Sequence, residues 1–315
     1  MKKKKHKPQI LYWIEYIGFL AMYKILRALS FRAALKLCAF FFWVFYVVDF
    51  HSRHLTISHL LHAKVAKNRR EAKEIAWKFY MQFSKLLTEI FKMDQVYDPN
   101  KIRIVGDEET IKKITSPDGV AQSSTNIIIV SAHYGNWEMA GAICPARSNR
   151  DMLSVMKPFG NPMVGELIMR NRRQKHLELL SKTTYGIAFK LIRELHAGKN
   201  VGLLIDQHVT EREGVDNVFF GQPCRTMKLP ALLHLKTGVP LIPGVARRIG
   251  DDFSFELVVA PMIQYKPTGD QAHDIKEICQ LCTTALEKLI IQQPEQWLWM
   301  HRRWTNINRK HHPHR

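Results

Sequence analysis

A histidine and a glutamate, His133 and Glu138, lie five residues apart directly after a run of β-branched residues. A carboxylate that binds one imidazole nitrogen fixes the tautomer, and the other nitrogen can then accept a proton. Gly135 lies between them and permits the tight turn that brings Glu138 back toward His133. The pair therefore predicts a general base with its orienting acid. The spacing by itself also fits a histidine with no catalytic role.

Covalent and metal chemistry are both disfavoured around this pair. No serine or cysteine stands in a nucleophile setting beside it, so the predicted reaction is direct attack by a substrate hydroxyl. No second histidine has the helical spacing that would share a zinc ion. Cys279 and Cys282 have the spacing of half a metal site, but they lack a second pair and fit an amphipathic helix. We therefore predict no metal and no cofactor.

The elements that would position the pair are those of an α/β fold. Short apolar strands alternate with helical patterns, which predicts a single catalytic domain with a mixed, largely parallel sheet flanked by helices. The predicted strands are 102–105, 126–131, 152–156, 201–205, 241–246 and 253–259. The predicted helices are 67–92, 137–144, 162–180, 188–197, 229–237 and 275–292. The second strand ends just before His133, at the sheet edge where reactive groups gather in such folds.

The charge of the chain is strongly unbalanced, with 47 Lys and Arg against 28 Asp and Glu and a formal net charge of +19. Such an excess predicts an anionic partner, which could be nucleic acid, an acidic protein or anionic membrane lipid. No zinc-finger spacing, aromatic RNA-binding box or arginine-rich repeat is present, so nucleic acid is not expected. Five scattered cysteines argue against a disulfide framework and favour a reducing compartment.

The N-terminal region, residues 1–60, combines basic clusters with two apolar runs, 10–23 and 37–48. Neither run reaches the roughly 20 apolar residues of a standard membrane span. Basic residues on both sides favour interfacial helices or a shallow hairpin over a single crossing, and a buried core helix with a solvated basic tail is the alternative. We expect 1–60 to attach to the membrane, 61–305 to form the catalytic domain, and the basic tail 306–315 to be disordered.

The segment SAHYGNWEMAG, which contains His133 and Glu138, resembles the active-site motif of the lipid A biosynthesis acyltransferases, the lauroyl and myristoyl transferases of Gram-negative bacteria. Further segments resemble blocks of that family in the same order along roughly residues 100–305. They are VMKPFGNPMVGELIMRNR, LIRELHAGKNVGLLIDQ, NVFFGQPCRT, KTGVPLIPGVARR and PEQWLWMHRRW. Several blocks in the right order are far more specific than any one of them.

The resemblance implies a glycerolipid-acyltransferase-like fold and transfer of a fatty acyl chain from an acyl carrier protein thioester to a hydroxyl of a lipid A precursor. His133 would be the base and Glu138 its orienter, and backbone amides near Asn136 would polarise the thioester carbonyl. The residues that it implies for substrate binding are Asn136, Arg170, Asp206, Gln207, Phe220, Gly221, Arg302 and Arg303. Membrane lipids are expected as further partners.

Each implied binding residue also has a structural interpretation. Arg170 fits a solvated arginine in a basic helix, and Asp206 with Gln207 fits the cap of a loop. Phe220 and Gly221 fit a turn lining the acyl or head-group pocket. The tryptophans beside Arg302 and Arg303 suit a packed closing segment.

One departure from the family pattern is His208, which directly follows Asp206 and Gln207 and precedes an unusually charged loop. It leaves the identity of the substrate open. The Pro-Glu-Gly-Thr block of the phosphatidate-forming acyltransferases is absent, which disfavours a glycerol phosphate acceptor. The alternatives are an acyltransferase acting on another membrane glycolipid or aminolipid, or an inactive membrane scaffold.

A single span with the basic N-terminus inside would place the catalytic domain outside, away from acyl carrier protein. We therefore predict that the chain lies on the bacterial inner membrane with both ends facing the cytoplasm and residues 9–50 embedded. In inverted vesicles, protease should reach tags at both termini, and deleting residues 1–50 should release much of the protein and lower its activity. A protected C-terminal tag beside an accessible N-terminal tag would instead indicate a single crossing.

Overall fold

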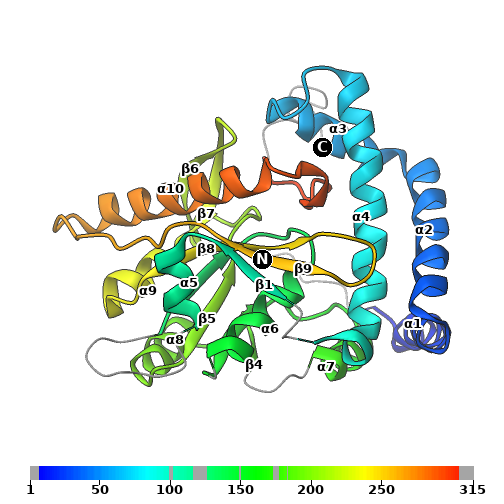
Figure 1. Cartoon of the computed structure of the whole chain (residues 1–315), viewed down its shortest axis with the longest axis horizontal. Coiled ribbons are helices and arrows are strands. Elements are labelled where there is room, and N and C mark those ends of the chain that lie inside the picture. The colour runs from blue at the N-terminus through cyan, green and yellow to red at the C-terminus, as the bar shows by residue number, and fades with distance from the viewer. Residues whose placement is uncertain are drawn as a thin grey trace.

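The structure, a computed structural model, describes residues 7–98, 102–115, 126–148, 150–172, 177–182 and 184–304. A seven-stranded sheet lies at its centre in the order β1-β9-β8-β2-β5-β3-β4 (Figure 1). These strands are β1 (Arg103–Gly106), β2 (Ile128–Ser131), β3 (Met152–Met156), β4 (Leu177–Ser181), β5 (Asn200–Leu204), β8 (Leu241–Arg248) and β9 (Phe255–Val259). All of their pairings are parallel except that of β8 with β9. The predicted fold class is confirmed.

Helices cover both faces of the sheet, and the strand sequences reflect this. They are α5 (Glu108–Thr115), α6 (Trp137–Ser148), α8 (Ile187–His196), α9 (Leu229–Thr237) and α10 (Gln271–Ile290), whereas α7 (Pro162–Arg172) packs against helices of the N-terminal region. In β2, Ile128 and Val130 belong to a core with residues of α8, α9 and α10, whereas Ile129 belongs to a second core with residues of α6. A strand buried on both faces reads as a continuous apolar run, which is why β2 was predictable.

Four helices precede the sheet: α1 (Gln9–Ala28), α2 (Phe31–Val48), α3 (Phe50–His62) and α4 (Arg69–Val96). The helices α1 and α2 lie beside α4 at one end of the molecule (Figure 1). Arg27 of α1 binds Asp94 of α4 at 2.6 Å. The predicted boundary at residue 60 falls within α3, where His59 Nδ1 bonds the Trp299 carbonyl at 2.8 Å. The predicted division into domains stays a prediction, and the tail 306–315 lies outside the described residues.

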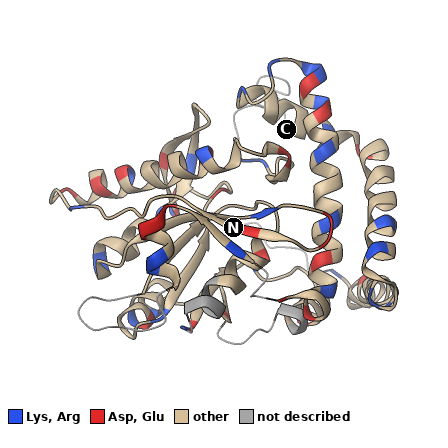
Figure 2. Cartoon of the chain, viewed as in Figure 1, with Lys and Arg blue, Asp and Glu red and all other residues tan. Residues whose placement is uncertain are grey.

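By length and composition, α2 is apolar enough to cross a membrane. It is longer than the expected run 37–48, because helical residues from Phe31 onward extend it. The upper part of α2 carries no charge (Figure 2), and only a small part of the helix is buried. The exposed apolar side chains on α1 and α2 include Trp13, Ile14, Ile17, Phe40, Phe41 and Trp43.

Two elements differ from the sequence predictions. The predicted helix 162–180 is wrong at its C-terminal end, because α7 ends at Arg172 and Leu177–Ser181 forms edge strand β4 against β3. An antiparallel hairpin of β6 (Gly214–Phe219) and β7 (Gln222–Met227) was not predicted. Its turn residues Phe220 and Gly221 have φ of 51° and 67°, and two positive φ values are the geometry of a type I′ hairpin turn.

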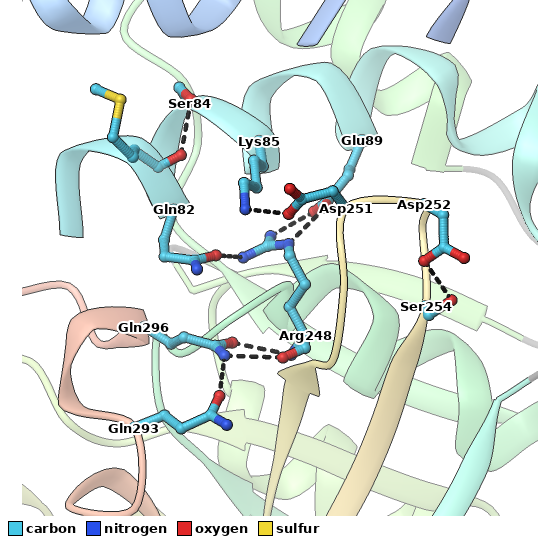
Figure 3. A network of polar contacts seen from close by, with 11 residues as sticks. Gln82, Ser84, Lys85, Glu89, Arg248, Asp251, Asp252, Ser254, Gln293 and Gln296 are labelled. Carbon is cyan, nitrogen blue, oxygen red and sulfur yellow. Dashed lines mark hydrogen bonds and ion pairs between the residues drawn. The ribbon is translucent and has the colours of Figure 1, made fainter. Parts of the chain in front are cut away.

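A buried ion pair joins α4 to the end of β8 (Figure 3). The guanidinium of Arg248 donates to both carboxylate oxygens of Glu89, each at 2.6 Å, and both side chains are 2% exposed. Arg248 Nη1 also donates to Gln82 Oε1 at 2.8 Å. The side-chain amide of Gln296 bonds the backbone N–H and carbonyl of Arg248, both at 2.9 Å. Both charges therefore have partners despite their burial.

Removing one partner of such a pair leaves the other charge buried without compensation. Glu89→Ala should lower the free energy of unfolding by about 3–5 kcal/mol. The exposed pair of Arg70 with Glu74, at 3.3 Å, is the control, and Arg70→Ala should leave stability nearly unchanged. Denaturant unfolding in detergent, followed by tryptophan fluorescence, measures both. Equal stability of Glu89→Ala and wild type would contradict this assignment.

Candidate active site

His133 lies just beyond the carboxyl end of β2, in a loop that the backbone holds closely. Gly135 has φ of 56°, and its N–H donates to the Gln296 carbonyl at 2.9 Å. A Cβ atom on Gly135 would lie 2.0 Å from the Ala246 carbonyl oxygen, so only glycine fits there. The N–H of Asn136 donates to that same oxygen at 3.2 Å. The amides predicted to polarise a carbonyl are therefore already bonded.

The imidazole of His133 is oriented by the carboxylate of Asp206. Nδ1 lies 2.8 Å from Asp206 Oδ1, and the His133 backbone N–H donates to Oδ2 at 2.9 Å. Trp297 Nε1 also donates to Oδ2, at 2.7 Å. Burial opposes ionisation of Asp206, but the charge of His133 and these hydrogen bonds together lower its pKa to about 2. An ionised carboxylate only accepts, so in the neutral ring Nδ1 carries the proton and Nε2 has the free lone pair.

The structure thus gives Asp206 the orienting position that the sequence analysis assigned to Glu138. The two strands explain why: Ser131 of β2 pairs in register with Leu204 of parallel β5. His133 and Asp206 each follow two residues later and meet at the same edge of the sheet. Glu138 lies instead in the first turn of α6, where it lines the same cavity as His133.

A cavity of about 330 Å³ opens beside His133, in the size range of small-molecule sites. It lies against one face of the sheet, and α6 contributes to its wall. Its apolar lining alternates along the strands and includes Ile129, Met152, Met156, Leu177, Leu179 and Leu204. Gly202 adds space, because a Cβ atom there would lie 3.4 Å from the Met152 sulfur. The lining beyond the carboxyl ends of the strands contains the polar residues His133, Lys157, Lys182, Gln207 and His208.

A polar group in this cavity, the Gln207 amide, faces the lone pair of His133. Gln207 Nε2 lies 3.2 Å from His133 Nε2 and donates to it, because Nδ1 holds the ring proton. Among the described residues, Ser131 Oγ and His208 Nδ1 have no hydrogen-bond partner. Sequence reasoning missed Ser131 as a site residue, although a hydroxyl that ends an otherwise apolar strand was the available signal.

Two residues predicted to bind substrate have structural roles. Asn136 is fully buried; its Oδ1 accepts from Met139 N at 3.3 Å and its Nδ2 donates to Glu89 at 3.1 Å. Arg303 is also fully buried and cannot meet a head-group phosphate. Its Nη1 donates to the carbonyls of Gln207 and Arg225 at 2.9 and 2.8 Å. Arg303 therefore supports the loop that carries Gln207.

The other residues predicted to bind substrate either do not line the cavity or have side chains outside the part of the chain that the structure describes. Phe220 and Gly221 form the hairpin turn, where the Phe220 ring packs 5.9 Å from that of Trp297. They are not among the residues that line the cavity. Arg302 is exposed and lies 3.0 Å from His51 Nε2. Arg170 belongs to α7, but its side chain is outside the described part of the chain. Substrate binding by Arg302 and Arg170 stays a prediction.

Comparison with known proteins gives a family profile and several curated relatives. The profile described as "Bacterial lipid A biosynthesis acyltransferase" matches residues 1–306. The chain is 26% identical over 186 residues to the lipid A biosynthesis lauroyltransferase of Escherichia coli (strain K12), covering 59% of this chain and 58% of that protein. It is 21% identical over 179 residues to the palmitoleoyltransferase of lipid A biosynthesis from the same strain, covering 56% and 55%.

A further relative is the phosphatidylinositol mannoside acyltransferase of Mycobacterium tuberculosis (strain ATCC 25618 / H37Rv). The chain is 22% identical to it over 188 residues, which cover 59% of this chain and 57% of that protein. The chain therefore spans less than two thirds of the length of the curated relatives that it matches.

The hydrogen bond to Asp206 should fix the tautomer and the orientation of His133. Asp206→Asn keeps the shape but removes the charge and lets the ring adopt the other tautomer, so turnover should fall about 10²–10⁴-fold. Trp297→Phe removes only one donor to the same carboxylate and should cost much less. Steady-state kinetics with both variants measures the difference. Near wild-type turnover of Asp206→Asn would show that another group orients the base.

Proposed function

The chain belongs to the bacterial lipid A biosynthesis acyltransferase family, and on that premise we propose that it transfers a fatty acyl chain from a thioester to a hydroxyl of a lipid A precursor. The observation that carries the proposal is the His133–Asp206 pair at the polar end of an apolar cavity. A base beside a space for a hydrocarbon chain is the arrangement that acyl transfer requires.

The proposed reaction is direct attack. The acceptor hydroxyl displaces the Gln207 amide from His133 Nε2 and gives its proton to that nitrogen as its oxygen bonds to the thioester carbon. The tetrahedral intermediate then collapses, the carbon–sulfur bond breaks, and the thiolate takes the proton from the imidazolium. Asp206 stabilises that imidazolium while it exists, because its carboxylate stays ionised. The base is thereby restored without any covalent acyl-enzyme.

The cavity is suited to the acyl chain of the donor. Its aliphatic walls run along β2 and β3. They extend from the carboxyl ends near His133 to Ile129 and Met152, which lie near the amino ends of these strands. Placing the chain there removes apolar surface from water, worth about 25 cal/mol per Å². The thioester then lies near His133, where the unpartnered Ser131 hydroxyl is a candidate donor to its carbonyl oxygen.

Other groups at the site fit the partners. Glu138 lines the cavity beside His133, and we assign it to binding the acceptor near the base. Arg170 and Arg302 are assigned to phosphate groups of the acceptor, for which guanidinium groups are well suited. The net charge of +19 favours acyl carrier protein, an acidic protein, as donor.

The proposal locates the chain on the cytoplasmic face of the bacterial inner membrane, where both substrates would be available. The exposed aromatic and aliphatic side chains of α1 and α2, with basic residues around them, support attachment to a lipid surface. The acceptor would then diffuse in the membrane to an enzyme already at its surface.

A second candidate acceptor is a mannose-containing glycolipid. The resemblance to a phosphatidylinositol mannoside acyltransferase favours it, at an identity close to that of the lipid A relatives. The same base and cavity would serve this reaction, and only the groups that recognise the acceptor would differ.

The full chain in detergent, incubated with acyl carrier protein thioesters and a lipid A precursor, should yield a product heavier by one acyl group in mass spectrometry. His133→Ala should lower the rate about 10²–10⁴-fold and Glu138→Ala should also lose most activity, with the fold retained. The control is His196→Ala, at an exposed position on α8.

Two outcomes would contradict the proposal. If the lipid A precursor were inert while a phosphatidylinositol mannoside was acylated, the acceptor would be the glycolipid. If donor alone produced a stoichiometric acyl adduct on the protein, for example at Cys224, direct attack would be excluded.

A further inference from the structure

The carboxylate of Glu89 on α4 binds two groups that belong to different parts of the fold. One is the guanidinium of Arg248 at the end of β8, with both oxygens at 2.6 Å (Figure 3). The other is Asn136 Nδ2, which donates to Glu89 Oε2 at 3.1 Å. Asn136 lies three residues after His133, directly before α6. Glu89 therefore connects a long helix to the loop that carries the base.

The rest of that loop is hydrogen-bonded to β8, which ends at Arg248, and to the segment that binds the Arg248 backbone. Asn136 N donates to the Ala246 carbonyl of β8, and the His133 carbonyl accepts from Leu298 N at 3.0 Å. Gly135 N donates to Gln296, whose side chain bonds the Arg248 backbone. The loop thus rests on β8 and on residues 294–298, and Glu89 ties β8 and the loop itself to α4.

The chemistry of the Glu89–Asn136 contact fixes its direction. A carboxylate only accepts hydrogen bonds, so the amide nitrogen of Asn136 must face Glu89. The amide oxygen then accepts from Met139 N and caps the first turn of α6. The Asn136 side chain thereby fixes both the start of α6 and the position of the loop relative to α4. Ser or Asp at this position would cap the helix equally well, but neither would donate to Glu89 as the amide does.

The helix α4 also carries the N-terminal helices. Phe91 of α4 lies in a buried cluster with Leu26 of α1 and Cys38 of α2, and Arg27 binds Asp94. The same α4 reaches the loop through a second contact, in which the Phe83 ring stacks 6.3 Å from Trp137, a neighbour of the His133 ring at 5.0 Å. Apolar contacts of this kind are tolerant of small shifts, whereas the Glu89–Asn136 hydrogen bond is not.

We propose that Glu89 is a positioning residue for the base: through Asn136 it keeps the His133 imidazole aligned with the cavity and fixed relative to the helices that carry the apolar N-terminal surface. The effect on rate rests on the proposed function, but the alignment of His133 does not. Misplacing a reacting group by about 1 Å can cost about 10²-fold in rate, so weakening the Glu89–Asn136 hydrogen bond should lower the rate strongly.

The direct test replaces the amide donor of Asn136 with an acceptor. Asn136→Asp keeps the helix cap but sets a carboxylate against that of Glu89, at a place where 3.1 Å now separates the partners. The loop should move, and kcat per folded molecule should fall about 10- to 100-fold with a smaller change in KM.

The matched control removes a neighbouring link between the same elements. Lys85 of α4 pairs with Asp251 in the loop after β8, and Lys85→Ala should leave kcat unchanged (Figure 3). Asn136→Ser is the second variant, because serine keeps the cap and cannot reach Glu89. If Asn136→Asp fails to fold, Asn136→Ser should still show the loss of kcat.

A readout independent of activity is the NMR resonance of the His133 Nδ1 proton, which reports its bond to Asp206. It should shift in Asn136→Asp and in Asn136→Ser, even if the wild type transfers no acyl group to the chosen acceptor. Wild-type kcat with an unshifted resonance in Asn136→Asp and Asn136→Ser would overturn the proposal. Activity lost only in proportion to the folded fraction would also overturn it.

Discussion

The parallel pairing of β2 with β5 decides where the imidazole and the carboxylate meet. His133 and Asp206 are 73 residues apart in sequence, yet each follows its strand by two residues, so the register brings them to 2.8 Å. Burial of Asp206 is tolerable only because three hydrogen bonds, one of them from the imidazole, stabilise its charge. The direction of the lone pair on Nε2 depends on this one contact.

The parts of the fold that follow from local pattern were predictable from the sequence. The β-branched run before His133 is β2, and the prediction of a mixed, largely parallel sheet is confirmed. Helix 229–237 matches α9 because a proline and a glycine mark its ends. The short edge strand Leu177–Ser181 was missed, since its leucines alternate weakly and the preceding helical pattern extends into it.

The roles of single polar residues were less predictable, because they depend on tertiary burial. Glu138 had the right spacing to orient His133, but the partner came from another strand, which no local pattern shows. Asn136 and Arg303 belong to segments that resemble family blocks, and each is fully buried, with the Asn136 amide and the Nη atoms of Arg303 bonded to neighbouring backbone or side chains. Polar residues near a base thus include those that shape the loop as well as those that touch substrate.

For the proposed acyl transfer, the hydrogen bond from Gln207 to His133 Nε2 has a consequence for selectivity between alcohol and water. An activated thioester bound beside a bare imidazole would be exposed to hydrolysis, because any water that reached Nε2 could be deprotonated there. With the amide in place the lone pair is occupied, and only a ligand held firmly enough to displace Gln207 gains access to it. A lipid hydroxyl has many further contacts for that purpose and a water molecule has few. In the resting enzyme, this hydrogen bond therefore disfavours hydrolysis of the thioester donor.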